Sequence, residues 1–554
     1  MAEDPIIRTC DSLAAVLVLT LATSAQASDK VAPLTTYVEA RAAEMNGDEA
    51  RSARLFAAMA AADPADRTIA RRAIATAIQS GQAELAVELA RNIPPDELPV
   101  DARLMLAADS LRRGKAKQAV ADLEQGATST EVELFAPLVK AWERTARGKS
   151  DGPASLAALP AGSPLAPIAE EQRAAMLFTL GKADEALPVA QKVLLQSGGR
   201  NTRLRLAFAD SLARLKRPDQ ALAMLQGDDE ALVAARARLA AGQSLGMAIE
   251  TPAAGYAEML MALAVDLGRD DNKALPISLT QVARHAYSGN SEAAILLALL
   301  LDADGRPDDA LALLRAIGPD DLLAGEALDV ETRLLGDGGD LEGALGRARA
   351  AAASTTAGPQ DYARMANVLG DMERHAEAAG AYGEAIARTK PGENPNLWTL
   401  YLLRVASLEQ ADRWAEAKSE LTIAMKLEPD NPLLLNFLGY GKLERGENLD
   451  EAEAMIRKAS ALRPDDASIT DSLGWALYKR GRLPEAVATL SRAAAGDPAQ
   501  SEIHEHLGDA LYTSGRRIEA RFSWQAAMIT ANDKAKIRLE RKMEAGLTPA
   551  TAAP

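Results

Sequence analysis

The chain has 554 residues, and 48% of them are hydrophobic, which is enough apolar surface for an extended core and excludes a wholly disordered protein. Aromatic residues make up only 4%, while Ala, Leu, Glu and Arg are abundant, a composition that favours helices over a many-stranded β architecture. The 62 Lys and Arg residues against 78 Asp and Glu residues give a formal net charge of −16. This charge disfavours nucleic acid and anionic membranes as partners, because both require a basic surface.

The first predicted element is a secretory signal peptide over residues 1–27. An uncharged apolar run, Leu13–Ala22, is followed by Ala25 and Ala27 in the A-x-A arrangement of a cleavage site. The run is too short to span a bilayer, which needs about 20 apolar residues. We therefore expect no transmembrane segment, cleavage after Ala27, and a mature protein in the periplasm.

The residues around the start of the apolar run leave two alternatives open. Glu3, Asp4 and Asp11 outnumber Arg8, whereas a signal peptide normally begins with a positive region. Either the true start lies further downstream, or the run is not a signal and the protein is cytoplasmic. The single cysteine, Cys10, precedes the run, so a lipid anchor after it is not supported and the exported chain would have no thiol.

Beyond the signal peptide, one sequence position recurs along the chain, mostly at intervals of 33 to 35 residues. A constant phase of this length is typical of stacked two-helix repeats, and it predicts about 14 of them. The longest step, of 52 residues, begins at Ala209, so we expect an N-terminal array over residues 28–226, an irregular helical seam over 227–290, and a C-terminal array over 291–533. The recurring position is occupied by Ala40, Ile74, Ala107, Ala141, Ala174, Ala209, Met261, Ala298, Thr332, Ala366, Val405, Gly439, Gly474 and Gly508.

The last three repeats carry the fullest motif. Gly439, Gly474 and Gly508 each follow a leucine, and each precedes a second glycine by seven residues and then a pair of alanines at the spacing of a second helix. This is the tetratricopeptide pattern, W-x2-L-G-x2-Y…A-x3-F…P. Small residues let the paired helices approach closely, and the second glycine ends the first helix in a left-handed cap. The sequence therefore predicts an all-α fold, a right-handed α-solenoid of tetratricopeptide-like helix pairs.

The repeats are followed by two short segments. Residues 534–545 are highly charged and helix-forming, which indicates a capping helix that solvates the open end of the array. Residues 546–554 are small and polar, and we expect a disordered tail there.

No group of residues predicts catalysis, a metal or a cofactor. The histidines are His285, His375, His504 and His506, and the last two lie only two residues apart on one predicted helix, so they point in different directions and cannot share a metal. We therefore expect a protein that is not an enzyme. An active site hidden in the irregular region around His285 remains as an alternative.

The candidate site is the groove lined by the first helices of the repeats. In tetratricopeptide arrays, positions 2, 5, 9, 12 and 13 of the first helix face this groove, and rigid aromatic side chains there are typical of binding hot spots. The alternative is that these aromatic rings only pack on one another and shield the inner helices. The predicted partner-binding residues are Phe437, Tyr440, Asp471, Trp475, Tyr478, Glu505, Asp509 and Tyr512.

Residues 432–531 resemble a group of tetratricopeptide proteins of the proteobacterial cell envelope. The resemblance rests on the segments LGY…LDEAEAMIRKA…P, DSLGWALYKRGRLPEAV and HEHLGDALYTSGRRIEA. One member of that group is a lipoprotein adaptor that binds a carboxyl-terminal processing protease and delivers peptidoglycan hydrolases to it. This chain differs from the adaptor because it lacks the cysteine that would carry the lipid.

The resemblance implies a non-catalytic scaffold or adaptor in the periplasm, whose groove binds an envelope protease, a cell-wall enzyme or the substrates of either. The alternative is a scaffold in exopolysaccharide or outer-membrane assembly machinery. In both cases the partners are proteins, no nucleic acid is involved, and a homo-oligomer is possible.

Overall fold

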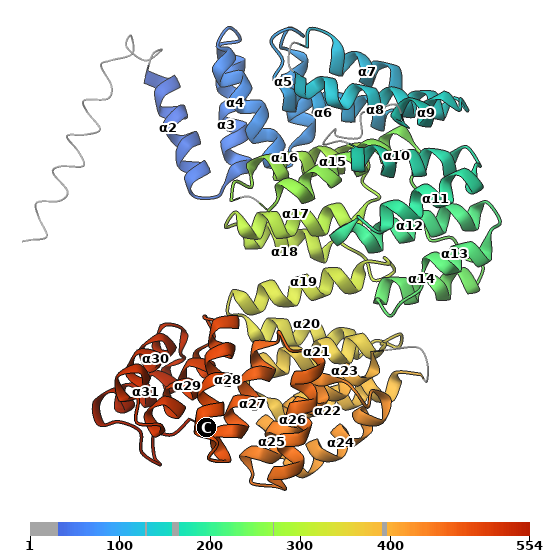
Figure 1. Cartoon of the computed structure of the whole chain (residues 1–554). Helices are drawn as coiled ribbons and strands as arrows, with labels where there is room; N and C mark the ends of the chain where they lie inside the picture. Colours follow the sequence, from blue (N-terminus) through green and yellow to red (C-terminus); the bar gives the residue numbers. More distant parts are fainter. Residues whose placement is uncertain (1–30, 128–129, 158–165, 270, 391–395, 554) are drawn as a thin grey trace, which may run out of the picture. The chain divides into compact units, whose positions relative to one another are not determined.

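The computed structural model describes residues 31–127, 130–157, 166–269, 271–390 and 396–553. All regular structure in these residues is helical, with 30 α-helices and one short 3-10 helix (Figure 1). The predicted signal peptide and Cys10 lie outside the described residues. The chain divides into two compact units, unit 1 up to Ala344 and unit 2 from Leu345 onward.

The helices of unit 1 are mostly 9 to 17 residues long and follow one another in antiparallel pairs. They are α2 (Val31–Met45), α3 (Glu49–Ala62), α4 (Arg67–Gln79), α5 (Ala83–Arg91), α6 (Val100–Arg112), α7 (Ala116–Glu124), α8 (Thr130–Ala146), α9 (Asp151–Ala157), α10 (Ala166–Thr179), α11 (Ala183–Leu194), η1 (Gly198–Arg200), α12 (Asn201–Arg214), α13 (Pro218–Met224), α14 (Glu230–Ala240), α15 (Pro252–Leu267), α16 (Ala274–Ala286), α17 (Ser291–Ala303), α18 (Pro307–Arg315) and α19 (Ala324–Asp337).

Helix α20 (Leu341–Ala352) contains the boundary between the units, and unit 2 continues with ten pair-forming helices and a single last helix. They are α21 (Pro359–Asp371), α22 (His375–Arg388), α23 (Leu397–Gln410), α24 (Trp414–Leu427), α25 (Pro432–Glu444), α26 (Leu449–Leu462), α27 (Ala467–Lys479), α28 (Leu483–Gly496), α29 (Ser501–Thr513), α30 (Arg517–Thr530) and α31 (Asp533–Ala545).

The predicted fold class is confirmed. Within the described residues, thirteen pairs of consecutive helices pack against each other, among them α27–α28 and α29–α30. The recurring small residue has the predicted packing role, since a Cβ atom on Gly474 would lie 2.6 Å from Leu490 Cγ in the paired helix. The second glycine of the motif also behaves as expected, because Gly481 ends its helix at φ 76°, where other residues are strained.

In unit 1, the pair α15–α16 packs against the first helices of earlier repeats, namely α4, α6, α8 and α10. Trp142 on α8 occupies a groove position, and its indole ring lies so close to Gly255 of α15 that a Cβ atom there would be 2.1 Å away. The hydroxyl of Tyr256 donates to the carbonyl oxygen of Leu104 on α6 over 3.0 Å. The groove face of these repeats is therefore filled by the protein's own helices.

A buried ion network holds this arrangement. Arg200 Nη1 lies 2.8 Å from one carboxylate oxygen of Glu171, and Arg200 also pairs with Glu258 on α15. Arg203 Nη2 lies 2.5 Å from Glu258, whose side chain is 1% exposed. The Asn290 amide donates to the same carboxylate over 3.0 Å. Each charge has a partner of opposite sign, as buried charges require.

The loop before α15 is also fixed to the groove face. Asp210 on α12 accepts hydrogen bonds from the backbone N–H groups of Leu245, Met247 and Ala248 at 2.8 to 3.2 Å. We expected residues 227–290 to form an irregular seam between two arrays. In the structure this region returns to cover the inside of unit 1, and the division between the compact units falls later, after Ala344.

Candidate functional site

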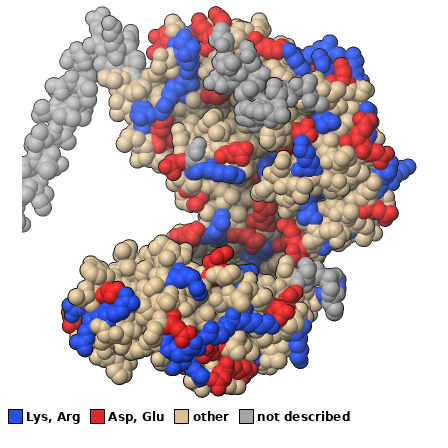
Figure 2. Space-filling view, viewed as in Figure 1, with Lys and Arg blue, Asp and Glu red and all other residues tan. Residues whose placement is uncertain are grey.

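The predicted groove residues of unit 2 lie on three successive first helices, α25, α27 and α29, which contact one another in order. We call the surface made by their groove positions the first-helix face. Figure 2 shows acidic and basic side chains interspersed on the visible face of each unit.

Trp475 is the centre of a stack of rings on α27 and α29. Its ring lies 4.7 Å from that of Tyr478 and 4.0 Å from that of His506, nearly parallel to both. The indole N–H donates to Glu444 Oε1 over 2.7 Å. Trp475 is only 1% exposed, so its ring is part of the core and does not present a free surface.

Asp471 and His506 form a buried pair beside this stack. Asp471 Oδ2 lies 2.8 Å from His506 Nδ1, and the histidine is fully buried. Burial by itself would lower the pKa of His506, but Asp471 and, more weakly, Glu502 and Asp509 raise it above its ordinary value. The other oxygen of Asp471, Oδ1, has no hydrogen-bond partner among the described residues.

At the end of unit 2, the acidic groove residues are paired with α31. Lys542 Nζ lies 2.7 Å from Glu505 Oε1 and 2.7 Å from Asp509 Oδ1, and all three side chains are buried. Arg538 donates twice to Glu505, over 2.7 Å each time. Burial favours the neutral form of Glu505, but Arg538 and Lys542 together lower its pKa.

The chain after α31 then turns back onto the first-helix face. Gly546 has φ 84°, and a Cβ atom on it would lie 2.2 Å from the hydroxyl oxygen of Tyr512. Ala553 N–H donates to Asp509 Oδ2 over 2.9 Å, and Ala553 is buried in the same apolar cluster as Trp475. We expected residues 546–554 to be disordered, whereas the structure describes residues 546–553 as a segment that covers four predicted groove residues: Trp475, Tyr478, Asp509 and Tyr512.

One pocket on the first-helix face, of about 170 Å³, is open among the described residues. Tyr440 and Phe437 are half-buried in it, and Asp471 lies beside them. Burial, followed by the nearby carboxylates of Glu502 and Glu444, raises the pKa of Tyr440. The full lining is Glu409, Asn436, Phe437, Tyr440, Gly441, Ser468, Asp471, Ser472, Gln500 and Glu502.

Sequence reasoning found three of these lining residues, of which Phe437 stands at position 6, outside the groove positions, and it missed others that do occupy groove positions. Phe437, Tyr440 and Asp471 were predicted to line the groove. Asn436, Ser468 and Glu502 occupy groove positions 5 and 2, and a strict application of the position rule would have found them. The remaining predicted residues, Trp475, Tyr478, Glu505, Asp509 and Tyr512, contact other parts of unit 2.

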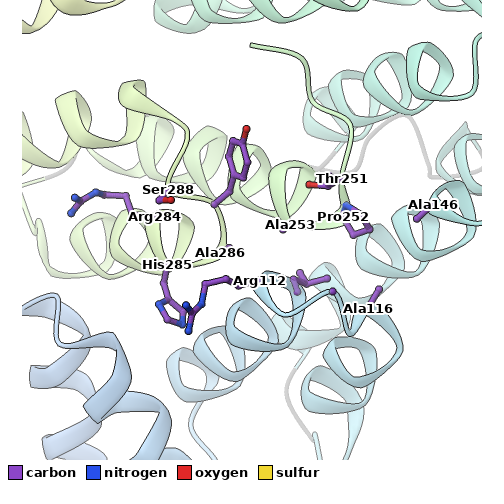
Figure 3. A pocket seen from close by; sticks show the side chains of 13 residues that line it. Arg112, Ala116, Ala146, Thr251, Pro252, Ala253, Arg284, His285, Ala286 and Ser288 are labelled. Atoms are coloured by element: carbon purple, nitrogen blue, oxygen red, sulfur yellow. The ribbon is translucent and has the colours of Figure 1, made fainter. Parts of the chain in front are cut away.

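A larger pocket, of about 660 Å³, lies in unit 1 and includes His285 (Figure 3). His285 and Arg112 point the same way, while Arg284 points away from both. His285 Nε2 is 3.5 Å from Asp109 Oδ1, and burial together with Arg112 lowers the pKa of His285. Among the described residues, no hydroxyl group is hydrogen-bonded to His285.

A known protein family matches the part of unit 2 that carries the first-helix face. Residues 474–515, which include the second half of α27 and all of α28 and α29, match the TPR repeat family. This part of the chain is a tetratricopeptide (TPR) repeat. The match begins at Gly474 and ends at Gly515, the two glycine positions on which the motif was recognised.

Several solved structures are similar to the chain. The Cut9–Hcn1 hetero-tetramer of APC/C is 13% identical over 97% of this chain and 99% of that chain, with a TM-score of 0.35. Yeast Tom70 is 12% identical over 94% and 96%, with a TM-score of 0.33. A TPR protein from Parabacteroides merdae is 15% identical over 46% and 97%, with a TM-score of 0.38. No curated protein sequence matches the chain.

Two further observations concern the described residues alone. No described helix is both long enough and apolar enough to cross a membrane. Within the same residues, no three His, Cys, Asp or Glu side chains come together in a way that could hold a metal ion.

Proposed function

We propose that this TPR protein is a non-catalytic scaffold or adaptor that binds protein partners on the first-helix face of unit 2. The proposal rests on the observation that the protein's own segments cover parts of its repeat grooves, whereas a pocket on the first-helix face of unit 2 is open. In unit 1, α15–α16 fills the groove face, and at the end of unit 2 the last helix and the segment after it do the same. In unit 2, the pocket around Tyr440 lies before the covered end of the array and remains open.

The composition of the open pocket suits a protein ligand. Half-buried aromatic rings such as Tyr440 and Phe437 give a rigid apolar contact at low conformational cost. Polar groups from α23, α25, α27 and the start of α29 surround the rings and can fix the orientation of a bound segment. We place no catalytic step in the protein, because neither the Tyr440 pocket nor the His285 pocket brings a nucleophile and a base into hydrogen-bond contact among the described residues.

For the cellular setting, we propose export to the periplasm and a partner that is an envelope protease, a cell-wall enzyme or one of their substrates. Support comes from the apolar run Leu13–Ala22 with its A-x-A sequence and from the resemblance of residues 432–531 to envelope TPR adaptors. Fractionation of cells that express the full chain tests the setting. Recovery of the protein only in the cytosol, with the first 27 residues retained, would refute it.

Crosslinking and pulldown from envelope fractions test the binding surface. The double variant Phe437→Ala/Tyr440→Ala should lose specifically crosslinked partners that the unmodified protein recovers. The matched control is Phe522→Ala, which removes a 66% exposed aromatic ring from α30, outside the first-helix face. Equal recovery by all three proteins would show that partners bind elsewhere.

A further inference from the structure

The open pocket of unit 2 contains two buried acceptor atoms that have no hydrogen-bond partner among the residues that the structure describes. They are Asn436 Oδ1 on α25 and Asp471 Oδ1 on α27, and both residues line the pocket. Buried polar atoms are nearly always hydrogen-bonded in folded proteins, so two orphaned acceptors at one place require an explanation. A donor that enters the pocket from outside would supply the missing hydrogen bonds.

The charges around the pocket indicate that this donor carries a positive charge. Asp471 shares its second oxygen with His506, and Glu409 lies 3.1 Å from Arg445, so both of these carboxylates are partly balanced. Glu502 is exposed at the pocket and forms no direct ion pair among the described residues; the cations that interact with it from further away, Arg538 and His506, are paired with Glu505 and Asp471. Because these cations are already paired, the pocket keeps an excess of carboxylate charge, which favours a cationic group.

The depth of the pocket and its aromatic rings indicate which kind of cationic group can enter it. The two orphaned oxygens are themselves buried, so the cation must be carried on a slim, flexible chain that can reach down to them. Tyr440 and Phe437 supply ring surface for the aliphatic part of such a chain, and ring faces also attract cations. A basic amino-acid side chain has each of these properties.

We propose that this pocket is a subsite for one lysine or arginine side chain of a partner protein bound along the first-helix face. The inference rests on the proposed scaffold function and adds the chemical class of the segment that is bound. The charged end of the side chain donates to Asp471 Oδ1 and Asn436 Oδ1, Glu502 balances its charge, and Tyr440 contacts its aliphatic stem.

Selection from a random dodecapeptide library displayed on phage, with the full-length protein as bait, tests the subsite. Peptides selected by the unmodified protein should share one position at which lysine or arginine is enriched. A synthetic peptide with norleucine at that position should bind about tenfold more weakly or worse. The same exchange should make little difference to binding by Glu502→Gln or Asp471→Asn, because the carboxylates that recognise the charge are gone.

Two controls keep the result interpretable. Glu502 is exposed, so Glu502→Gln should keep the fold even if Asp471→Asn disturbs its pairing with His506. Glu428→Gln removes an exposed carboxylate outside the pocket of the same unit and should select and bind peptides as the unmodified protein does.

The outcomes separate the two proposals. The subsite proposal is wrong if the selected peptides bind but share no basic position. It is also wrong if Glu502→Gln and Asp471→Asn prefer the basic residue over norleucine as strongly as the unmodified protein does. Either result leaves the scaffold function standing. If the bait selects no peptide at all, both proposals fail for this face.

Discussion

The backbone N–H of Ala553 donates to Asp509 Oδ2 over 2.9 Å, and this hydrogen bond ties the last described residue to the middle of α29. Asp509 also accepts from the indole N–H of Trp524 and from Lys542 Nζ, so its two oxygens join α30, α31 and the end of the chain. The end of the TPR array is thus closed by specific polar contacts over a groove that would otherwise be exposed.

Removal of the segment after Ala545 should expose the ring stack at Trp475. Without Ala553 and its neighbours, Trp475 loses an apolar cover, so tryptophan emission should shift to longer wavelength and acrylamide quenching should increase. The measurement compares the full chain with a chain that ends at Ala545. In a second comparison, both chains carry Trp475→Phe, and the difference between them should be much smaller.

Lys542→Met should destabilise unit 2 by about 3–5 kcal/mol, because it leaves two buried carboxylates short of a cation. Thermal and urea unfolding of the full chain measure the loss. Lys534→Met, an exposed position on the same helix, should change stability by less than about 0.5 kcal/mol. Adding Asp509→Asn to Lys542→Met should restore part of the stability, and a further loss of similar size would contradict the proposed charge pairing.

Glu258→Gln should loosen the pair α15–α16 from the groove face of unit 1. The change removes the anion shared by Arg200 and Arg203. Arg200 keeps Glu171 and Glu292, but Arg203 loses its ion-pair partner and remains a buried, unpaired cation, at a cost of about 3–5 kcal/mol. Hydrogen exchange followed by mass spectrometry should show faster exchange in residues 252–286. Glu250→Gln breaks only a half-exposed pair with Arg214, so it should cost about 0–1 kcal/mol and leave that exchange unchanged.

The Asp471–His506 pair should contribute less to the stability of unit 2 as the pH rises. The folded-state pKa of His506 is raised, so the stabilisation from its charged form is complete below the ordinary histidine pKa of about 6.5 and is lost as the pH passes through the raised value. The gap in unfolding free energy between the unmodified protein and His506→Gln should therefore shrink from about pH 6 to about pH 9. A gap that grows over this range would mean that the ring is buried in its neutral form. His504→Gln serves as the control for loss of a histidine from the same helix.

The helix pairs could be predicted from sequence because each depends on residues close together in the chain. Gly474 contacts Leu490 within one repeat, and Gly481 ends a helix by its own backbone conformation. The same local requirements recur about every 34 residues, so the period can be recognised even where the motif of a single repeat is incomplete.

The candidate site was harder to predict because its accessibility depends on residues far away in sequence. Trp475 occupies a groove position, but its burial comes from His506 on the next repeat and from Ala553 beyond the array. In the same way, Asp509 was read as a groove carboxylate, whereas Lys542 neutralises it. A position rule within one repeat contains no information about such partners.

The position of Lys542 has a consequence for how this protein could grow during evolution. Lys542 lies 34 residues after Gly508, so α31 stands in the phase of a further first helix, with a cation where a repeat would carry a small residue. A duplication of α29–α30 just before α31 would preserve the closure only if the new copy kept both Glu505 and Asp509. The pairing of Glu505 and Asp509 with Lys542 thus closes the end of the array. A duplicated repeat that keeps the two carboxylates would bind the same last helix, so the array could become longer without a different capping helix.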